Sequence, residues 1–155
     1  MTDAPCPIPP VPPAVLAVAG ERHLRLAWAN EIGGLTYEVT GRPGPAARSG
    51  PAAGLGPAAR SGRAAAEARE EPGRIFVKWV PATSGVDLSA EVARLAWAGP
   101  YSPVPRVLDR GCDGDGSWMV TAGLAGDSAA SPRWLADPAR AVAAVGSGLR
   151  ALHRA

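Results

Sequence analysis

The sequence predicts an α+β fold in which a small antiparallel sheet carries one helix. Two runs, His23–Trp28 and Leu35–Val39, alternate apolar and polar residues with the period of two that a strand requires. Arg74–Val80 is a third, more apolar strand candidate. The helix prediction falls on Leu88–Ala98, because Asp87 suits the N-cap position and Gly99-Pro100 follows its end.

Three further elements follow in the C-terminal half. Pro103–Asp109 and Ser117–Thr121 are predicted as short strands joined by a glycine-rich turn over 111–116. A final helix is predicted from Pro138 to His153, since Asp137-Pro138 is a favourable start. Its apolar stripe consists of Val142, Val145, Leu149 and Leu152, which we expect to be partly exposed. The prediction is therefore a sheet of about five strands with one helix on it and a helix beyond it.

Glycine and proline divide the chain into regions. Residues 1–20 are predicted to be a Pro-rich tail, and 21–124 to be the sheet-containing lobe. Within that lobe, 41–72 is predicted to be a disordered Gly/Pro/Ala/Arg insertion, in which the heptapeptide Gly44–Gly50 recurs as Gly56–Gly62. One recurrence is too few for a solenoid. Residues 125–155 are expected to begin a second, helical lobe.

Charge and cysteine content exclude several classes of function. The net charge of +2 comes from residues 41–71, which hold five arginines and three glutamates but no aromatic residue. Basic residues without a folded face or stacking aromatics do not predict nucleic-acid binding. The two cysteines, Cys6 and Cys112, lie outside any zinc-ligand spacing. We expect a cytoplasmic protein with reduced thiols, no bound metal and no membrane span.

One group of residues has the chemistry of a candidate binding site. Lys78 interrupts the apolar strand Arg74–Val80, and a buried cation is costly unless a partner neutralises it. Glu91, on the following helix, is the candidate partner. Strand alternation places Phe76 on the same face as Lys78, so an aromatic ring could contact a nucleotide base while the ammonium contacts phosphate. The alternative is that Lys78 lies at a sheet edge and extends its ammonium group to water.

A glycine turn precedes the second strand. Gly33-Gly34 could let backbone N–H groups approach the phosphates of a bound nucleotide closely. Most such glycine pairs are ordinary turns, so this motif is weaker evidence than the lysine.

These segments together resemble the aminoglycoside phosphotransferases, in particular the kanamycin/neomycin 3'-phosphotransferase branch. The resemblance covers roughly residues 22–40 and 73–155. Its matching segments keep their order and spacing: Arg74–Val80, Asp87–Trp97, Val104–Leu108, Gly116–Val120, Ala125–Asp127 and Gly148–His153.

The resemblance implies the fold of a protein-kinase-like N-terminal lobe and an ATP site. It implies that Lys78 contacts the ATP phosphates, that Glu91 is the ion-pair partner of Lys78, and that Phe76 stacks on adenine. It also implies a nucleotide loop within Glu31–Tyr37, including Ile32, Gly33, Gly34 and Thr36. Thr121–Leu124 would be the hinge, where the backbone of Ala122 and of Leu124 hydrogen-bonds the adenine edge.

The resemblance further implies an ATP-dependent aminoglycoside O-phosphotransferase, an enzyme class of antibiotic resistance. The family's His-Gly-Asp-x-x-x-x-Asn loop is absent, because His23 and His153 begin no such motif. We therefore expect an N-terminal lobe of a truncated enzyme, with no catalytic residue, no Mg²⁺ ligands and no phosphotransfer of its own. Aminoglycoside and Mg²⁺ would bind only to a full-length form. The alternative is a non-catalytic kinase-like module that binds nucleotide or a partner protein.

Overall fold

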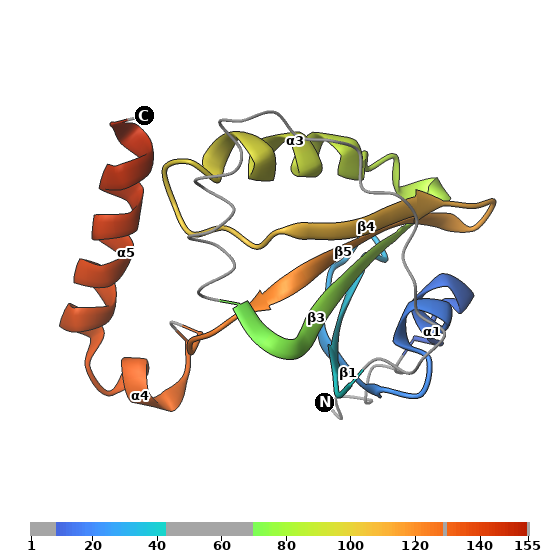
Figure 1. Ribbon diagram of the computed structural model, residues 1–155, viewed down its shortest axis with the longest axis horizontal. Helices are drawn as coiled ribbons and strands as arrows, with labels where there is room; N and C mark the ends of the chain where they lie inside the picture. Colours follow the sequence, from blue (N-terminus) through green and yellow to red (C-terminus); the bar gives the residue numbers. More distant parts are fainter. Residues whose placement is uncertain (1–8, 43–69, 129, 155) are drawn as a thin grey trace, which may run out of the picture.

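A five-stranded antiparallel sheet organises the computed structural model, which describes residues 9–42, 70–128 and 130–154 (Figure 1). The strand order is β1-β2-β3-β5-β4, so β3 is the central strand. The strands are β1 (His23–Ala29), β2 (Leu35–Thr40), β3 (Glu70–Pro81), β4 (Val107–Cys112) and β5 (Gly116–Leu124). Sheet and helices together confirm the predicted α+β class. The repeat predicted within the insertion lies outside the described residues.

Two helices have the bounds that the sequence predicted. Helix α3 (Leu88–Ala98) begins where the Asp87 carboxylate accepts a hydrogen bond from the Ser89 N–H at 2.8 Å. Helix α5 (Pro138–His153) begins where the Asp137 carboxylate accepts one from the Arg140 N–H at 3.2 Å. In both, a side-chain oxygen satisfies an N–H group that the first helical turn cannot pair.

The predicted tail over 1–20 is wrong from Pro13 onward. Residues Pro13–Ala19 form helix α1, with proline at the first helical position, where its missing N–H costs nothing. Val15 and Ala19 are buried at 0% and 3% exposure. The proline-rich composition favoured the prediction of an extended tail, although this segment forms a helix that contributes to the core.

Strand boundaries also differ from those predicted. β3 begins at Glu70, four residues before the predicted strand, so residues 70–72 belong to the sheet and not to an insertion. β4 begins at Val107, later than predicted, and extends through the first residues of the expected turn to Cys112. β5 continues to Leu124, so the predicted hinge is its last part. Two short helices were not predicted, η1 (Ala82–Ser84) and α4 (Pro132–Leu135).

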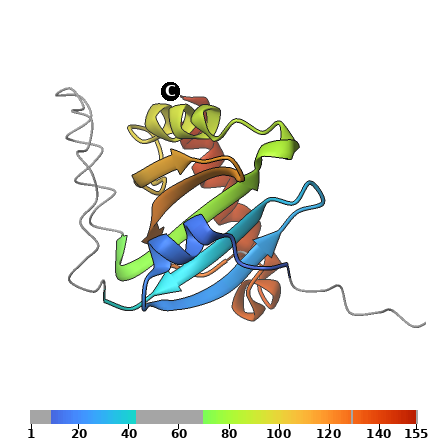
Figure 2. The same ribbon diagram turned by 90° about the vertical axis from the view of Figure 1, so that its right-hand side faces the viewer.

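The two faces of the sheet are covered by different helices. Val15 and Ala19 of α1 pack against one face in a cluster with Tyr37, Val39 and Val77. On the opposite face Leu88 of α3 packs with Val80 and Met119. Figures 1 and 2 show the two helices on opposite sides of the strands. The face beneath α3 is less completely filled with apolar side chains, and the candidate site lies there.

Helix α5 lies beyond the end of β5, connected through α4 (Figure 1). Its apolar stripe is exposed as expected: Val142 by 72%, Val145 by 52% and Leu149 by 50%. None of the helices in the described part of the chain combines the length and hydropathy of a membrane span.

Candidate functional site

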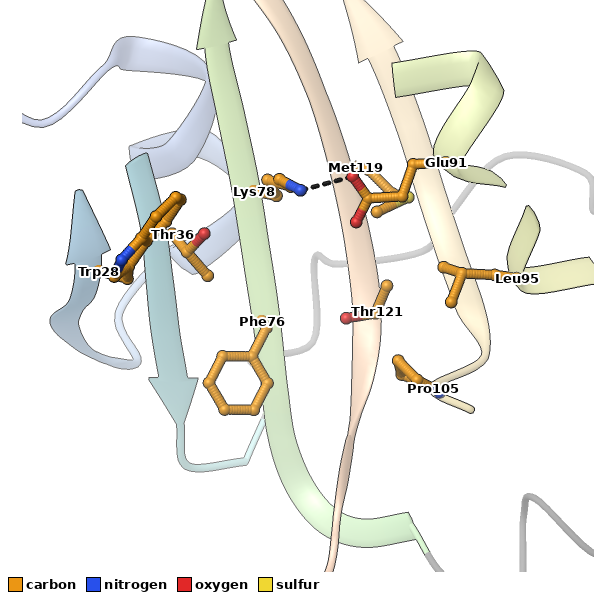
Figure 3. Close-up of a pocket in the computed structure, with 9 residues that line it drawn as sticks. All are labelled: Trp28, Thr36, Phe76, Lys78, Glu91, Leu95, Pro105, Met119 and Thr121. Atoms are coloured by element: carbon orange, nitrogen blue, oxygen red, sulfur yellow. Dashed lines mark hydrogen bonds and ion pairs between the residues drawn. The ribbon is translucent and has the colours of Figure 1, made fainter. Parts of the chain in front are cut away.

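An open pocket of about 200 Å³ lies between the sheet and α3. Figure 3 shows side chains entering it from β1, β2, β3, β5 and α3. The nine lining residues are Trp28, Thr36, Phe76, Lys78, Glu91, Leu95, Pro105, Met119 and Thr121. Four of the residues predicted from sequence, Thr36, Phe76, Lys78 and Glu91, therefore meet at one site.

Lys78 and Glu91 form the predicted ion pair, with the Lys78 ammonium donating to the Glu91 carboxylate (Figure 3). Lys78 is held in the middle of the sheet, since it is paired with Thr36 on β2 and with Met119 on β5. The edge position considered as an alternative is thereby excluded. Glu91 reaches the lysine from the first turn of α3.

The ion pair is accessible to solvent from the pocket. The Lys78 and Glu91 side chains are 31% and 35% exposed. Water therefore screens the pair, and we expect its loss to cost less than the about 3–5 kcal/mol of a fully buried pair. An ammonium group that is oriented by a carboxylate but still reached by solvent can also contact an anionic ligand.

Phe76 lies beside this pair on the same face of β3, two residues and so roughly 7 Å along the strand from Lys78. Its neighbours across the sheet are Glu38 on β2 and Thr121 on β5. An aromatic ring, a hydroxyl group and a cation in one open pocket suit a ligand that joins a planar ring to an anion.

Trp28 is a lining residue that the sequence pattern placed on the wrong face. Strict alternation puts it with Leu24 and Leu26, which pack against the core beneath α1. A register shift between Leu26 and Trp28 pairs Trp28 with Thr36 and brings it to the pocket face. Such a bulge redirects the side chain that follows it. No local signal in the sequence marks the shift.

Two amides of the predicted nucleotide loop are hydrogen-bonded within the turn. The Gly33 N–H donates to the Asn30 carbonyl at 3.2 Å, and the Gly34 N–H donates to Asn30 Oδ1 at 2.6 Å. Gly33 has a positive φ of 83° and packs on Pro81, and Ile32 is 52% exposed at the turn. The turn is present as predicted, but Ile32, Gly33 and Gly34 are not among the residues that line the pocket.

The predicted hinge is likewise engaged within the sheet. The Ala122 N–H donates to the Arg106 carbonyl at 2.9 Å, so it is not available to a ligand. Leu124 ends β5 and is paired with Glu70. Beside it, Arg106 makes a bidentate ion pair with Glu70 at 3.0 and 2.9 Å. Neither Ala122 nor Leu124 lines the pocket.

A network of arginines and glutamates adjoins Phe76 on the pocket face. Glu38, only 8% exposed, accepts hydrogen bonds from Arg25 Nε at 2.9 Å and from Arg74 Nε at 2.6 Å. The Arg25 hydrogen bond, followed by that of Arg74, lowers the pKa of Glu38, while burial opposes them. The pKa of Arg74 is raised, first by its hydrogen bond to Glu71.

Glu38 is expected to make the stability of the fold depend on pH. Because its pKa is lower in the folded chain than the ordinary 4.5, its stabilising contribution is complete above about pH 4.5 and lost as pH falls through the folded value. The melting temperatures of the wild type and Glu38→Gln should therefore differ most at pH 7 and converge below pH 4.5. A difference that is constant between pH 7 and pH 3 would show that the Glu38 charge contributes nothing.

Within the described ranges, no group of three or more histidine, cysteine, aspartate or glutamate side chains could hold a metal ion. Cys112 is exposed on β4 and has a free thiol.

An antiparallel sheet whose central lysine pairs with a glutamate on the neighbouring helix is the arrangement of a kinase-like N-terminal lobe. Comparison with known proteins finds similar sequences among phosphotransferases. The chain is 41% identical over 75 residues to an aminoglycoside 3'-phosphotransferase of Streptomyces fradiae and 39% identical over 75 residues to one of Streptomyces ribosidificus.

These matches confirm the resemblance inferred from the sequence and support a kinase-like function at the level of the family. Each match covers 47% of this chain and 28% of the relative, so the chain aligns with less than a third of those proteins. No protein-family model matches the chain.

Proposed function

We propose that the pocket binds a nucleoside triphosphate, and that the chain is the nucleotide-binding lobe of an aminoglycoside phosphotransferase. Lys78 contacts the phosphates, Glu91 orients the lysine, and the Phe76 ring stacks on the base. The observation that carries the proposal is the joint placement of Phe76, Lys78 and Glu91 in one open pocket. The named relatives support the transferase class and aminoglycosides as the acceptors of a complete enzyme.

The pocket by itself holds only part of such a ligand. Its volume of about 200 Å³ lies below the about 300–1,000 Å³ typical of small-molecule sites. We therefore expect weak binding, since much of the nucleotide stays in contact with water. The 155 residues contain no family catalytic loop, so binding without phosphoryl transfer is the expected behaviour of this chain. The residues present give no ground for deriving a step through Mg²⁺.

The test is to measure binding of ATP, GTP and inorganic tripolyphosphate to the 155-residue chain by equilibrium dialysis. Phe76→Ala should weaken ATP binding at least about fivefold, because stacking on an aromatic ring is worth about 1–3 kcal/mol per base. It should leave tripolyphosphate, which has no base, unchanged. Comparing ATP with GTP decides which purine the site prefers.

Trp97→Ala is the matched control. Trp97 is an aromatic residue on α3 that is 60% exposed, contacts Tyr101 and does not line the pocket. If it weakened ATP binding as much as Phe76→Ala, the pocket would not be the binding site. Absence of binding of both ATP and tripolyphosphate would refute the proposal and leave the alternative of a module that binds a partner protein.

A further inference from the structure

The guanidinium group of Arg74 lies over the ring of Phe76. Its Cζ is 5.1 Å from the ring centroid, within the range of a cation–π contact. The two residues are neighbours on one face of β3, but only Phe76 lines the pocket. The arginine therefore contacts the Phe76 ring but is not itself part of the pocket lining, to which the ring belongs.

Two carboxylates fix this guanidinium. Arg74 Nε donates to Glu38 Oε1 at 2.6 Å, and Nη1 donates to Glu71 Oε2 at 2.8 Å. Glu38 is itself held from the other side by Arg25, so three strands contribute to the arrangement. Arg74 is only 25% exposed, which means that its position is set by its partners more than by solvent.

Glycine on the neighbouring strand makes room for the aliphatic part of Arg74. A Cβ at Gly123 of β5 would lie 2.8 Å from Arg74 Cγ and 2.9 Å from the Arg74 carbonyl oxygen. Any larger residue at position 123 would therefore displace the Arg74 side chain from its contact with the Phe76 ring.

The charge balance argues against Arg74 as a phosphate ligand. Arg25 and Arg74 are matched by Glu38 and Glu71, and hydrogen bonds to these two glutamates occupy Nε and Nη1 of Arg74. The cluster is electrically neutral, so it does not attract a polyphosphate in the way that Lys78 at the pocket does.

We propose that Arg74 is a positioning residue for the base: it holds Phe76 from one side so that a nucleotide base stacks only on the other, in a guanidinium–phenyl–base layer. This inference rests on the proposed nucleotide site and adds the residue that orients its aromatic platform. A ring fixed before binding loses less rotational freedom when the base arrives, which raises affinity for ligands that have a base.

The experiment compares ATP with inorganic tripolyphosphate on Arg74→Lys, which keeps the charge and loses the planar guanidinium. We expect the Kd for ATP to rise about three- to tenfold and that for tripolyphosphate to stay within about twofold. Glu38→Gln should shift ATP binding in the same direction, and the double variant should be little worse than Arg74→Lys alone, because both changes release one contact. Arg110→Lys, at an exposed arginine on β4, is the control.

The outcomes separate this inference from the proposed function. If Phe76→Ala weakens ATP binding but Arg74→Lys and Glu38→Gln do not, Arg74 has no positioning role and only this inference fails. Equal weakening of ATP and tripolyphosphate by Arg74→Lys would make Arg74 a phosphate ligand and overturn the inference as well. If Phe76→Ala has no effect on ATP, the proposed function fails, and the inference fails with it. A thermal melting curve of each variant shows whether it is folded at the temperature of the dialysis experiment.

Discussion

Lys78→Met is expected to reduce the affinity of the chain for ATP by about ten- to a hundredfold. The substitution keeps most of the length and apolar character of the side chain and removes the ammonium group. The lost interaction is a charge-assisted hydrogen bond to phosphate, worth about 1.5–3 kcal/mol. Tripolyphosphate should lose affinity by a similar factor, because this contact does not involve the base.

Two further variants make the Lys78 experiment specific. Arg94→Met removes one positive charge from an exposed position on α3, and should leave ATP binding within about twofold at physiological salt. Glu91→Gln keeps the Lys78 ammonium and removes its orienting charge, so we expect a smaller effect than that of Lys78→Met. If Lys78→Met and Arg94→Met weakened binding equally, the effect would come from net charge and not from a contact at the pocket.

Much of the fold could be predicted because its signals are local. The alternation in His23–Trp28 and Leu35–Val39 located β1 and β2, and the caps Asp87 and Asp137 located the starts of α3 and α5. Helix α1 was missed because prolines at 12 and 13 resemble an extended tail, although proline at the first position also starts helices. The ambiguity is resolved only by the core that Val15 and Ala19 join.

The candidate site also contains residues that the sequence pattern predicts and residues that it does not. Phe76, Lys78 and Glu91 could be predicted, since two-residue spacing on a strand and an unpaired lysine in an apolar run are visible in the sequence. Trp28 could not, because the bulge before it is a property of how β1 pairs with β2. Glu38 meets Arg74 across two paired strands that are far apart in sequence, so this contact also depends on register.

The predicted loop residues Ile32, Gly33 and Gly34 and the predicted hinge residues Ala122 and Leu124 do not line the pocket. The roles predicted for them belong to backbone groups, and whether a backbone group can bind a ligand depends on its other partners. Asn30 takes the amides of the glycine turn, and the Arg106 carbonyl takes that of Ala122. The side chains of Phe76 and Lys78 take no part in the backbone hydrogen bonds of the sheet. Strand alternation alone sets the face on which they lie, and both line the pocket.

Gly116→Ala is expected to destabilise the chain by about 3 kcal/mol or more, the upper range for overpacking a tight site. Gly116 begins β5, the strand that supplies Met119 and Thr121 to the pocket wall. A Cβ there would overlap the Val80 carbonyl oxygen and approach the Trp79 ring to 2.9 Å. The carbonyl belongs to the backbone of the central strand, so relief requires a shift of the β3–β5 ladder and not a change of rotamer.

Urea unfolding of Gly116→Ala and Gly114→Ala measures this effect against a close control. Gly114 lies two residues earlier in the same hairpin turn, has no positive φ, and a Cβ there would meet no atom within 4 Å. Gly114→Ala should therefore change the free energy of unfolding by no more than about 0.5 kcal/mol. Because a displaced β5 also moves the pocket wall, Gly116→Ala should weaken ATP binding even where the variant is still folded. Equal unfolding free energies for the two variants would mean that β5 does not approach β3 as closely as the structure shows.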